Sequence, residues 1–106
     1  MSALISIITI TRNRASLIHR CIESIQKQTY RHYEHLIIDG NSEDNTEAVV
    51  NAYAVSDSHI KYIKLDKNHP IPQTYLIAYK ACKGDYITSL DDDDEYYPNK
   101  IEQQLH

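Results

Sequence analysis

Four consecutive aspartates, Asp91 to Asp94, are the residues of this sequence best suited to do chemistry. They follow a short apolar run, Tyr86 to Leu90, that predicts a buried strand. Adjacent carboxylates repel one another unless a cation lies among them, and hard divalent cations such as Mg²⁺ and Mn²⁺ prefer oxygen ligands and bridge to phosphates. Because charge runs usually face water, a solvated acidic turn is the alternative to a metal–phosphate site.

Two further polar clusters each follow an apolar run that predicts a strand. Thr11 to Arg14 come after Leu4 to Ile10, and Asp39 to Ser42 come after Tyr33 to Ile38. The carboxyl ends of parallel strands lie at one edge of a sheet, where open α/β sheets bind their ligands. We therefore expect all three clusters to converge, and this convergence favours the metal–phosphate site over the solvated turn.

Predicted strands and helices alternate along the chain and must position these clusters, and the sequence shows no linker or internal repeat. One more strand is predicted from Ile60 to Leu65. The predicted helices run from Ala15 to Gln28, from about Ser42 to Val55, from Gln73 to Lys83 and from Pro98 to His106. Strands that alternate with helices imply right-handed crossovers and a mostly parallel sheet, so the expected fold class is α/β.

Local details of the second and third helices are also predicted. Ser42 or Asn41 caps the second helix, so that Glu43 and Asp44 lie in its first turn, where negative charge is favourable. Gly84 closes the third helix, in the position where glycine adopts the left-handed conformation. The inward face of the second helix is expected to carry Ala48, Val49, Ala52 and Tyr53.

Composition excludes several classes of function. The chain has 106 residues, enough for one small domain, and a formal net charge of -4 without a basic block, so nucleic acid is not an expected partner. Its two glycines cannot form a G-x-G-x-x-G or Walker A loop. Met1-Ser2-Ala3 leads straight into a strand, which indicates no signal peptide. Cys21 and Cys82 are expected as buried free thiols in a reducing cytoplasm.

Six short motifs follow one another along almost the whole chain. They are Ile7–Arg14, Ser24–Tyr30, Ile37–Thr46, Lys83–Ile87, Leu90–Asp94 and Pro98–Glu102. Together they resemble the nucleotide-binding half of inverting glycosyltransferase family 2. The resemblance implies a Rossmann-like GT-A fold with a mostly parallel four-stranded sheet flanked by helices.

The resemblance also implies how a nucleotide is held. Thr11 and Arg12 would line the base pocket, and Asp39 would accept a hydrogen bond from the base, typically from a uracil N–H. Asp91 or Asp92 would touch the ribose. The nucleotide would then be the carrier of an activated sugar, most simply a UDP-sugar.

The metal and the reaction follow from the same resemblance. Asp93 would ligate the Mg²⁺ or Mn²⁺ that bridges the diphosphate, and the sugar would pass with inversion to a glycan or lipid-linked acceptor. The expected location of the protein is the cytoplasm, including the inner face of the membrane. Family members continue with strands that bind the acceptor and supply a general base, for which these residues offer no candidate. We therefore expect residues 1–106 to form a single domain, truncated before that part, with an exposed sheet edge open to self-association.

Alternatives stay open for single residues and for the whole chain. Asp39 could be a turn residue, and Arg12 and Arg14 could be solvated loop charges. A calcium loop is disfavoured because Tyr96 stands where such a loop needs glycine. A phosphotransfer domain is disfavoured because the first strand does not end in an aspartate. A non-catalytic nucleotide-binding domain is the main alternative to a transferase.

Overall fold

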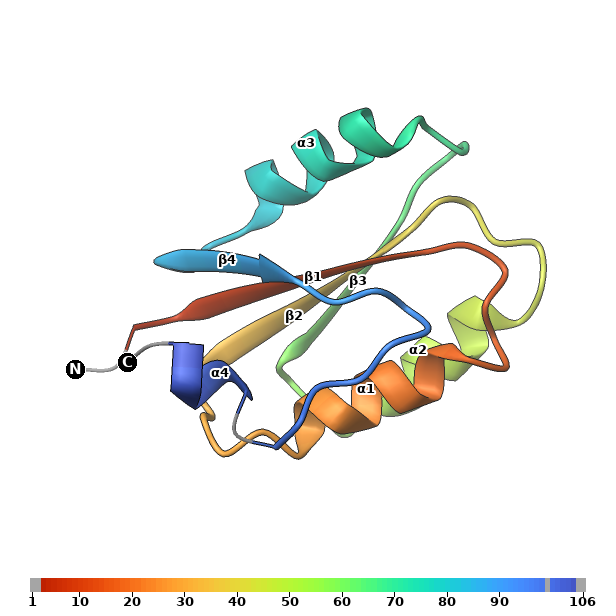
Figure 1. Cartoon of the computed structure of the whole chain (residues 1–106). Coiled ribbons are helices and arrows are strands. Elements are labelled where there is room, and N and C mark those ends of the chain that lie inside the picture. Colours follow the sequence, from red (N-terminus) through yellow and green to blue (C-terminus); the bar gives the residue numbers. More distant parts are fainter. Residues whose placement is uncertain (1–2, 99, 105–106) are drawn as a thin grey trace.

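The computed structural model describes residues 3–98 and 100–104 and contains one four-stranded sheet with helices on both faces (Figure 1). The strands are β1 (Ile5–Thr11), β2 (Tyr33–Asp39), β3 (Ile60–Lys64) and β4 (Tyr86–Ser89). The helices are α1 (Ile18–Gln26), α2 (Thr46–Ala54), α3 (Ile71–Ala81) and α4 (Lys100–Gln104). The predicted end of the last helix, His106, lies outside the described residues.

The sheet is parallel throughout and has the strand order β3-β2-β1-β4. The two central strands, β1 and β2, are buried along nearly their whole length. The mostly apolar sequence of β1 suits a sheet that is covered on both faces, and in β2 the polar Glu34 and His35 are buried as well. The predicted α/β class and parallel sheet are thus confirmed.

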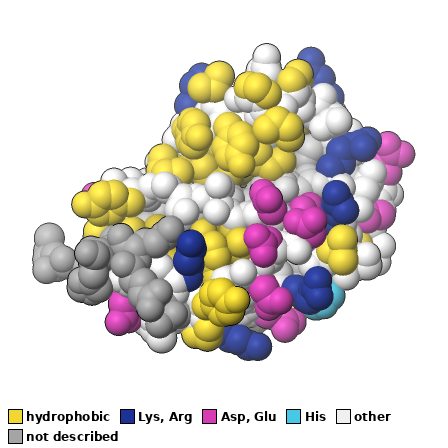
Figure 2. Space-filling view, viewed as in Figure 1, with side chains coloured by type: hydrophobic (Ala, Val, Ile, Leu, Met, Phe, Trp, Pro, Cys, Tyr) yellow, Lys and Arg dark blue, Asp and Glu magenta, His cyan; other side chains and the backbone are white. Residues whose placement is uncertain are grey.

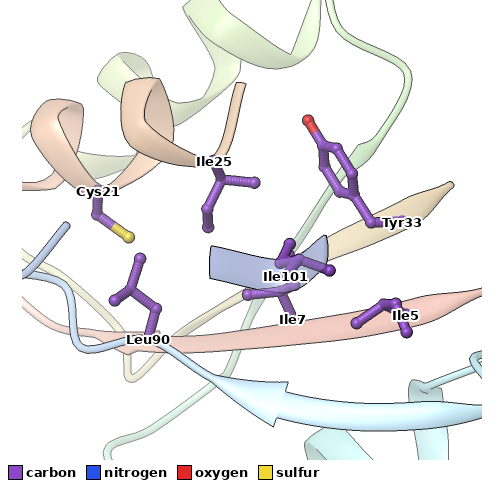
Figure 3. Close-up of a cluster of buried hydrophobic side chains, with 7 residues drawn as sticks. All are labelled: Ile5, Ile7, Cys21, Ile25, Tyr33, Leu90 and Ile101. Carbon is purple, nitrogen blue, oxygen red and sulfur yellow. The ribbon is translucent and has the colours of Figure 1, made fainter. Parts of the chain in front are cut away.

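Helices α1 and α2 cover one face of the sheet, and α3 covers the other (Figure 1). Under α1, a cluster of buried side chains joins β1, β2, α1, Leu90 and Ile101 of α4 (Figure 3). Beside it, Ile37 and Ile60 pack against Ile22 of α1 and Val50 of α2. Because both Leu90 and Ile101 belong to the first cluster, the chain on either side of the acidic run is anchored to the same core.

The start and the inward face of α2 differ from the prediction. The helix begins at Thr46 after Asn45, so Glu43 and Asp44 precede it, and Ser42 does not cap it. The Ser42 hydroxyl donates instead to Asp39. The buried residues are Thr46 and Val50, with Val49 and Tyr53 partly buried, whereas Ala48 and Ala52 are exposed. Val49 and Tyr53 thus face inward as predicted, whereas Ala48 and Ala52 do not.

Gly84 does not close α3 in a left-handed conformation. Helix α3 ends at Ala81, the backbone of the next residue, Cys82, is extended, and no glycine of the described residues has a positive φ. A Cβ on Gly84 would lie 2.5 Å from the Ser6 Oγ and 2.7 Å from the Ser6 N. Glycine is therefore required here because the backbone passes close to β1. Cys82 is partly exposed, while Cys21 is buried, and both thiols are free.

Strand β4 is not the buried strand that its apolar sequence predicts. It lies at the edge of the sheet beside β1, and its Tyr86 and Ile87 side chains are 60% and 47% exposed. An apolar patch spans α3 and β4 in Figure 2. The exposed large apolar side chains of these two elements are Ile71, Leu76, Tyr79, Tyr86 and Ile87.

We predict that the chain self-associates through the open edge of β4. An unpaired strand edge beside exposed apolar side chains is a template for pairing with another strand. The weight-average mass in sedimentation equilibrium should rise with protein concentration. Ile87→Lys should suppress this rise, whereas Val55→Lys, a change of an exposed residue just after α2, should leave it in place. A chain that stays monomeric at all concentrations would contradict the prediction.

Candidate nucleotide and metal site

The three polar clusters lie together at the carboxyl ends of their strands. Thr11 and Asp39 are paired in the register of β1 and β2. The Thr11 hydroxyl donates to the Asp92 Oδ2 at 2.9 Å, and the Arg14 Nε lies 3.7 Å from the same oxygen. Residues 81 positions apart in the sequence thus meet directly. The predicted convergence is confirmed.

The loops after β1 and β2 are joined by hydrogen bonds centred on Asn13. This residue has a φ of 56°, a left-handed conformation that asparagine tolerates better than most residues. Its N–H donates to the Ser42 Oγ at 2.9 Å, and its Oδ1 accepts the Glu43 N–H at 2.7 Å. The Arg14 N–H donates to the Thr46 Oγ1 at 3.1 Å. The two loops therefore form one unit, which carries both arginines.

Asp39 is enclosed beneath these loops, with no exposed surface. Its Oδ1 accepts both the N–H and the hydroxyl of Ser42 at 2.7 Å, and its Oδ2 accepts the hydroxyl of Tyr62. Burial and the adjacent Asp39 raise the pKa of Tyr62, so the phenol stays a donor. Asp39 does not line the nearby pocket. Its role as the acceptor for a base stays a prediction, and no pattern in the sequence identifies Tyr62 as its partner.

A pocket of about 220 Å³ opens where β1, β2 and the start of α3 meet. It is lined by Ile10, Thr11, Arg12, Arg14, Gly40, Asn68, His69, Ile71, Thr74 and Asp92. The isoleucines form an apolar part of its wall, and the two arginines contribute positive charge. Gly40 keeps it open, because a Cβ there would lie 2.9 Å from the Asn68 Oδ1. Such a pocket suits a flat ring that carries an anionic group.

The acidic run lies beside this pocket. Asp92 is partly buried, and its pKa is raised by burial and by its neighbours Asp93 and Asp91, against the hydrogen bond from Thr11 and the charge of Arg14. Asp91, Asp93 and Asp94 are exposed. Figure 2 shows acidic side chains grouped next to basic ones in the middle of this face. Two wider hollows, of about 550 and 490 Å³, flank residues 94–97, and neither includes Thr11 or Arg12.

The donor set of the acidic run fits a hard divalent cation that shares its ligands with a phosphate. Carboxylate oxygens are the right type of ligand. Among the described residues, no group of three or more His, Cys, Asp or Glu side chains is arranged to hold a metal. Mg²⁺ and Mn²⁺ commonly take only one or two protein carboxylates and complete their shell with water and phosphate oxygens. The Asp93 carboxylate has no hydrogen bond within the described part of the chain, so it is free to be one of these ligands.

Comparison with known proteins gives the family. The profile of glycosyl transferase family 2 matches residues 6–106. The chain belongs to this family. This chain is 36% identical over 103 residues to the UDP-Glc:alpha-D-GlcNAc-diphosphoundecaprenol beta-1,3-glucosyltransferase WfaP of Escherichia coli. The matched residues cover 97% of this chain and 40% of WfaP.

Solved structures agree with the GT-A fold. Staphylococcus aureus TarS 1-349, in complex with UDP-GlcNAc, superposes with a TM-score of 0.82 at 26% identity, over 95% of this chain and 29% of that one. The mannosyltransferase PcManGT of Pyrobaculum calidifontis, in complex with GDP-Man and Mn2+, has a TM-score of 0.81 at 21% identity, over 87% of this chain and 28% of that one. This family 2 chain spans 34–40% of the length of several curated relatives. None of its described helices has the length and apolar character to cross a membrane.

Proposed function

We propose that this family 2 chain binds a UDP-sugar together with Mg²⁺ or Mn²⁺, as the donor-binding part of an inverting glycosyltransferase. The observation that carries the proposal is the hydrogen bond from Thr11 to Asp92, which joins the acidic run to the pocket with its two arginines. The uridine nucleotide is supported by the relatives, since WfaP is named for UDP-Glc and TarS was solved with UDP-GlcNAc.

Each site residue has a proposed role. Thr11 and Arg12 contact the base side of the nucleotide, while Asp39 supports their loop and remains a candidate acceptor for the base N–H. Asp91 or Asp92 contacts the ribose, and Asp93 would hold the cation. Once bound, the cation would neutralise the charge that develops on the departing diphosphate.

The acceptor and the cellular place are also proposals. A glycan or lipid-linked acceptor is supported by the name of WfaP, whose acceptor is a diphosphoundecaprenol-linked sugar. Transfer of a sugar to such an acceptor would place the protein in the cytoplasm, at the inner face of the membrane. Because the chain spans only about a third of several relatives, transfer by residues 1–106 alone is not proposed. A non-catalytic nucleotide-binding domain is the second candidate, because the described residues offer no candidate general base.

The test is a calorimetric titration of the chain with UDP, CDP, GDP and UDP-GlcNAc, each with and without Mn²⁺. We expect uridine nucleotides to bind best and Mn²⁺ to tighten them. Failure of every nucleotide to bind would overturn the proposal. Acceptor-dependent release of UDP by this chain would contradict the non-catalytic alternative, although the proposal does not require it of residues 1–106 alone.

A further inference from the structure

The segment that follows the acidic run is attached to the end of α1. The Tyr96 N–H donates to the Ser24 Oγ at 3.1 Å, and the Thr29 N–H donates to the carbonyl of Pro98 at 2.8 Å. Between these two contacts lies Gln28, just after α1. The acidic run therefore has a fixed end on each side: β4 before it, and this attachment after it.

Gln28 makes the most extensive of these contacts. Its Nε2 donates to the Tyr97 carbonyl at 2.7 Å and to the Ser24 carbonyl at 3.2 Å, and its Oε1 accepts the Ile101 N–H at 3.1 Å. The side chain is 2% exposed, so these bonds are shielded from water. A buried polar side chain that uses both its donor and its acceptor group holds its partners in one arrangement.

Among the described residues, Asp92 is the one member of the acidic run whose side chain is held by the loop after β1. Thr11 and Arg14 contact Asp92, whereas Asp91 and Asp93 have no side-chain hydrogen bond to the described residues. Asp94 is tied to the run itself, since its N–H donates to the Asp91 carbonyl at 3.1 Å. The place of Asp93 is thus set by the backbone on either side of it. After the run, that backbone is held by Gln28 together with the bonds from the Tyr96 N–H to Ser24 and from the Tyr96 hydroxyl to the Ser89 carbonyl.

We propose that Gln28 is a positioning residue for the acidic run, and that its amide sets the coupling between the divalent cation and the nucleotide. The inference rests on the proposed function and extends it to a residue that touches neither ligand. Groups that orient metal ligands indirectly typically change metal affinity by roughly 10- to 100-fold when they are removed. Loss of the Gln28 amide should therefore affect the metal-dependent part of nucleotide binding.

The test compares Gln28→Met, which keeps the length and loses the amide, with Val50→Ala, which loosens the core cluster under α2, a cluster that includes neither Gln28 nor the acidic run. UDP is titrated by calorimetry into each protein with and without Mn²⁺. We expect Gln28→Met to bind UDP alone as the unchanged chain does, while its enhancement by Mn²⁺ falls about tenfold or more. Val50→Ala should keep the enhancement. Exchange of the Ile101 amide hydrogen, followed without metal, should be faster in Gln28→Met.

The outcomes separate this inference from the proposed function. If the unchanged chain shows no enhancement by Mn²⁺, the proposed function fails and the inference fails with it. If the unchanged chain shows it and folded Gln28→Met keeps it in full, only the inference is overturned. An equal loss in Val50→Ala would also overturn it, since loosening of the fold would then explain both. Should Gln28→Met not fold, Gln28→Glu, which keeps an acceptor for the Ile101 N–H and loses the donor to the Tyr97 carbonyl, replaces it with the same expected and contrary results.

Discussion

Asp93→Asn should abolish the enhancement of UDP binding by Mn²⁺ and leave the fold intact. The substitution keeps the shape of the side chain and removes the charge that a hard cation needs. Because a single carboxylate binds Mg²⁺ or Mn²⁺ weakly without phosphate oxygens, cation and diphosphate should bind cooperatively. By linkage, each must tighten the other by the same factor, typically about 5- to 150-fold.

The measurement is calorimetry of UDP with and without Mn²⁺ on the unchanged chain, Asp93→Asn and Asp94→Asn, with circular dichroism to check folding. Asp94→Asn is the matched control, since Asp94 belongs to the same run and its Oδ1 accepts the N–H of Glu95. We expect the control to keep most of the enhancement. Equal enhancement in the unchanged chain and in Asp93→Asn would remove Asp93 from the metal site.

Gly84→Ala should destabilise the fold strongly, although it adds one methyl group at a partly exposed position. The new Cβ would lie 2.7 Å from the Ser6 N and 2.9 Å from the Leu4 carbonyl oxygen, and neither backbone atom can move without distorting β1. Overpacking of this kind costs about 1–3 kcal/mol. The loss should appear as a lower urea midpoint with an unchanged slope.

The hydrogen bonds around Ser6 should add to this loss. The Ser6 Oγ accepts the Gly84 N–H at 2.8 Å and donates to the buried Glu34 Oε2 at 2.5 Å. Burial would raise the pKa of Glu34, but hydrogen bonds from Lys61, the Lys83 N–H and Ser6 lower it overall. Displacing Ser6 therefore weakens the support of a buried carboxylate.

Gly40→Ala is the control for Gly84→Ala. Its closest new contact, at 2.9 Å, is with the Asn68 Oδ1, the end of a flexible side chain that can turn away. We expect a change in unfolding free energy well below that of Gly84→Ala. Equal stability of the two variants would show that the close approach of Gly84 to β1 is not the constraint described above.

The elements and the converging clusters could be predicted because they depend on local periodicity and on a general rule for parallel sheets. The apolar runs of β1 and β2 and the helical stripe of α1 indicate their own burial. The exposure of β4 could not be predicted, because its apolar run does not reveal which strand it pairs with or that it lies at the edge. Its sequence is that of a buried strand, yet it has only β1 as a neighbour.

The support of the site could not be predicted, because it depends on contacts between distant residues. Tyr62 holds Asp39 from β3, and Gln28 holds residues about 70 positions later. Gln28 lies in one of the motifs of the family resemblance, but a glutamine at the end of a helix has no local pattern that names its partner. The left-handed Asn13 is similar, since its partners lie in the next β–α loop.

The order of the strands has a consequence for folding during synthesis. The ribosome releases amino-terminal residues first, so β1 emerges before the other three strands of its sheet. Its partner β4 is made about 80 residues later, which at about 5–20 residues per second is a delay of several seconds. During this interval a nascent chain can pair β1 with β2, but the opposite edge of β1 stays unpaired. We expect chaperones that bind extended apolar segments to protect this edge until Leu90 has left the ribosome.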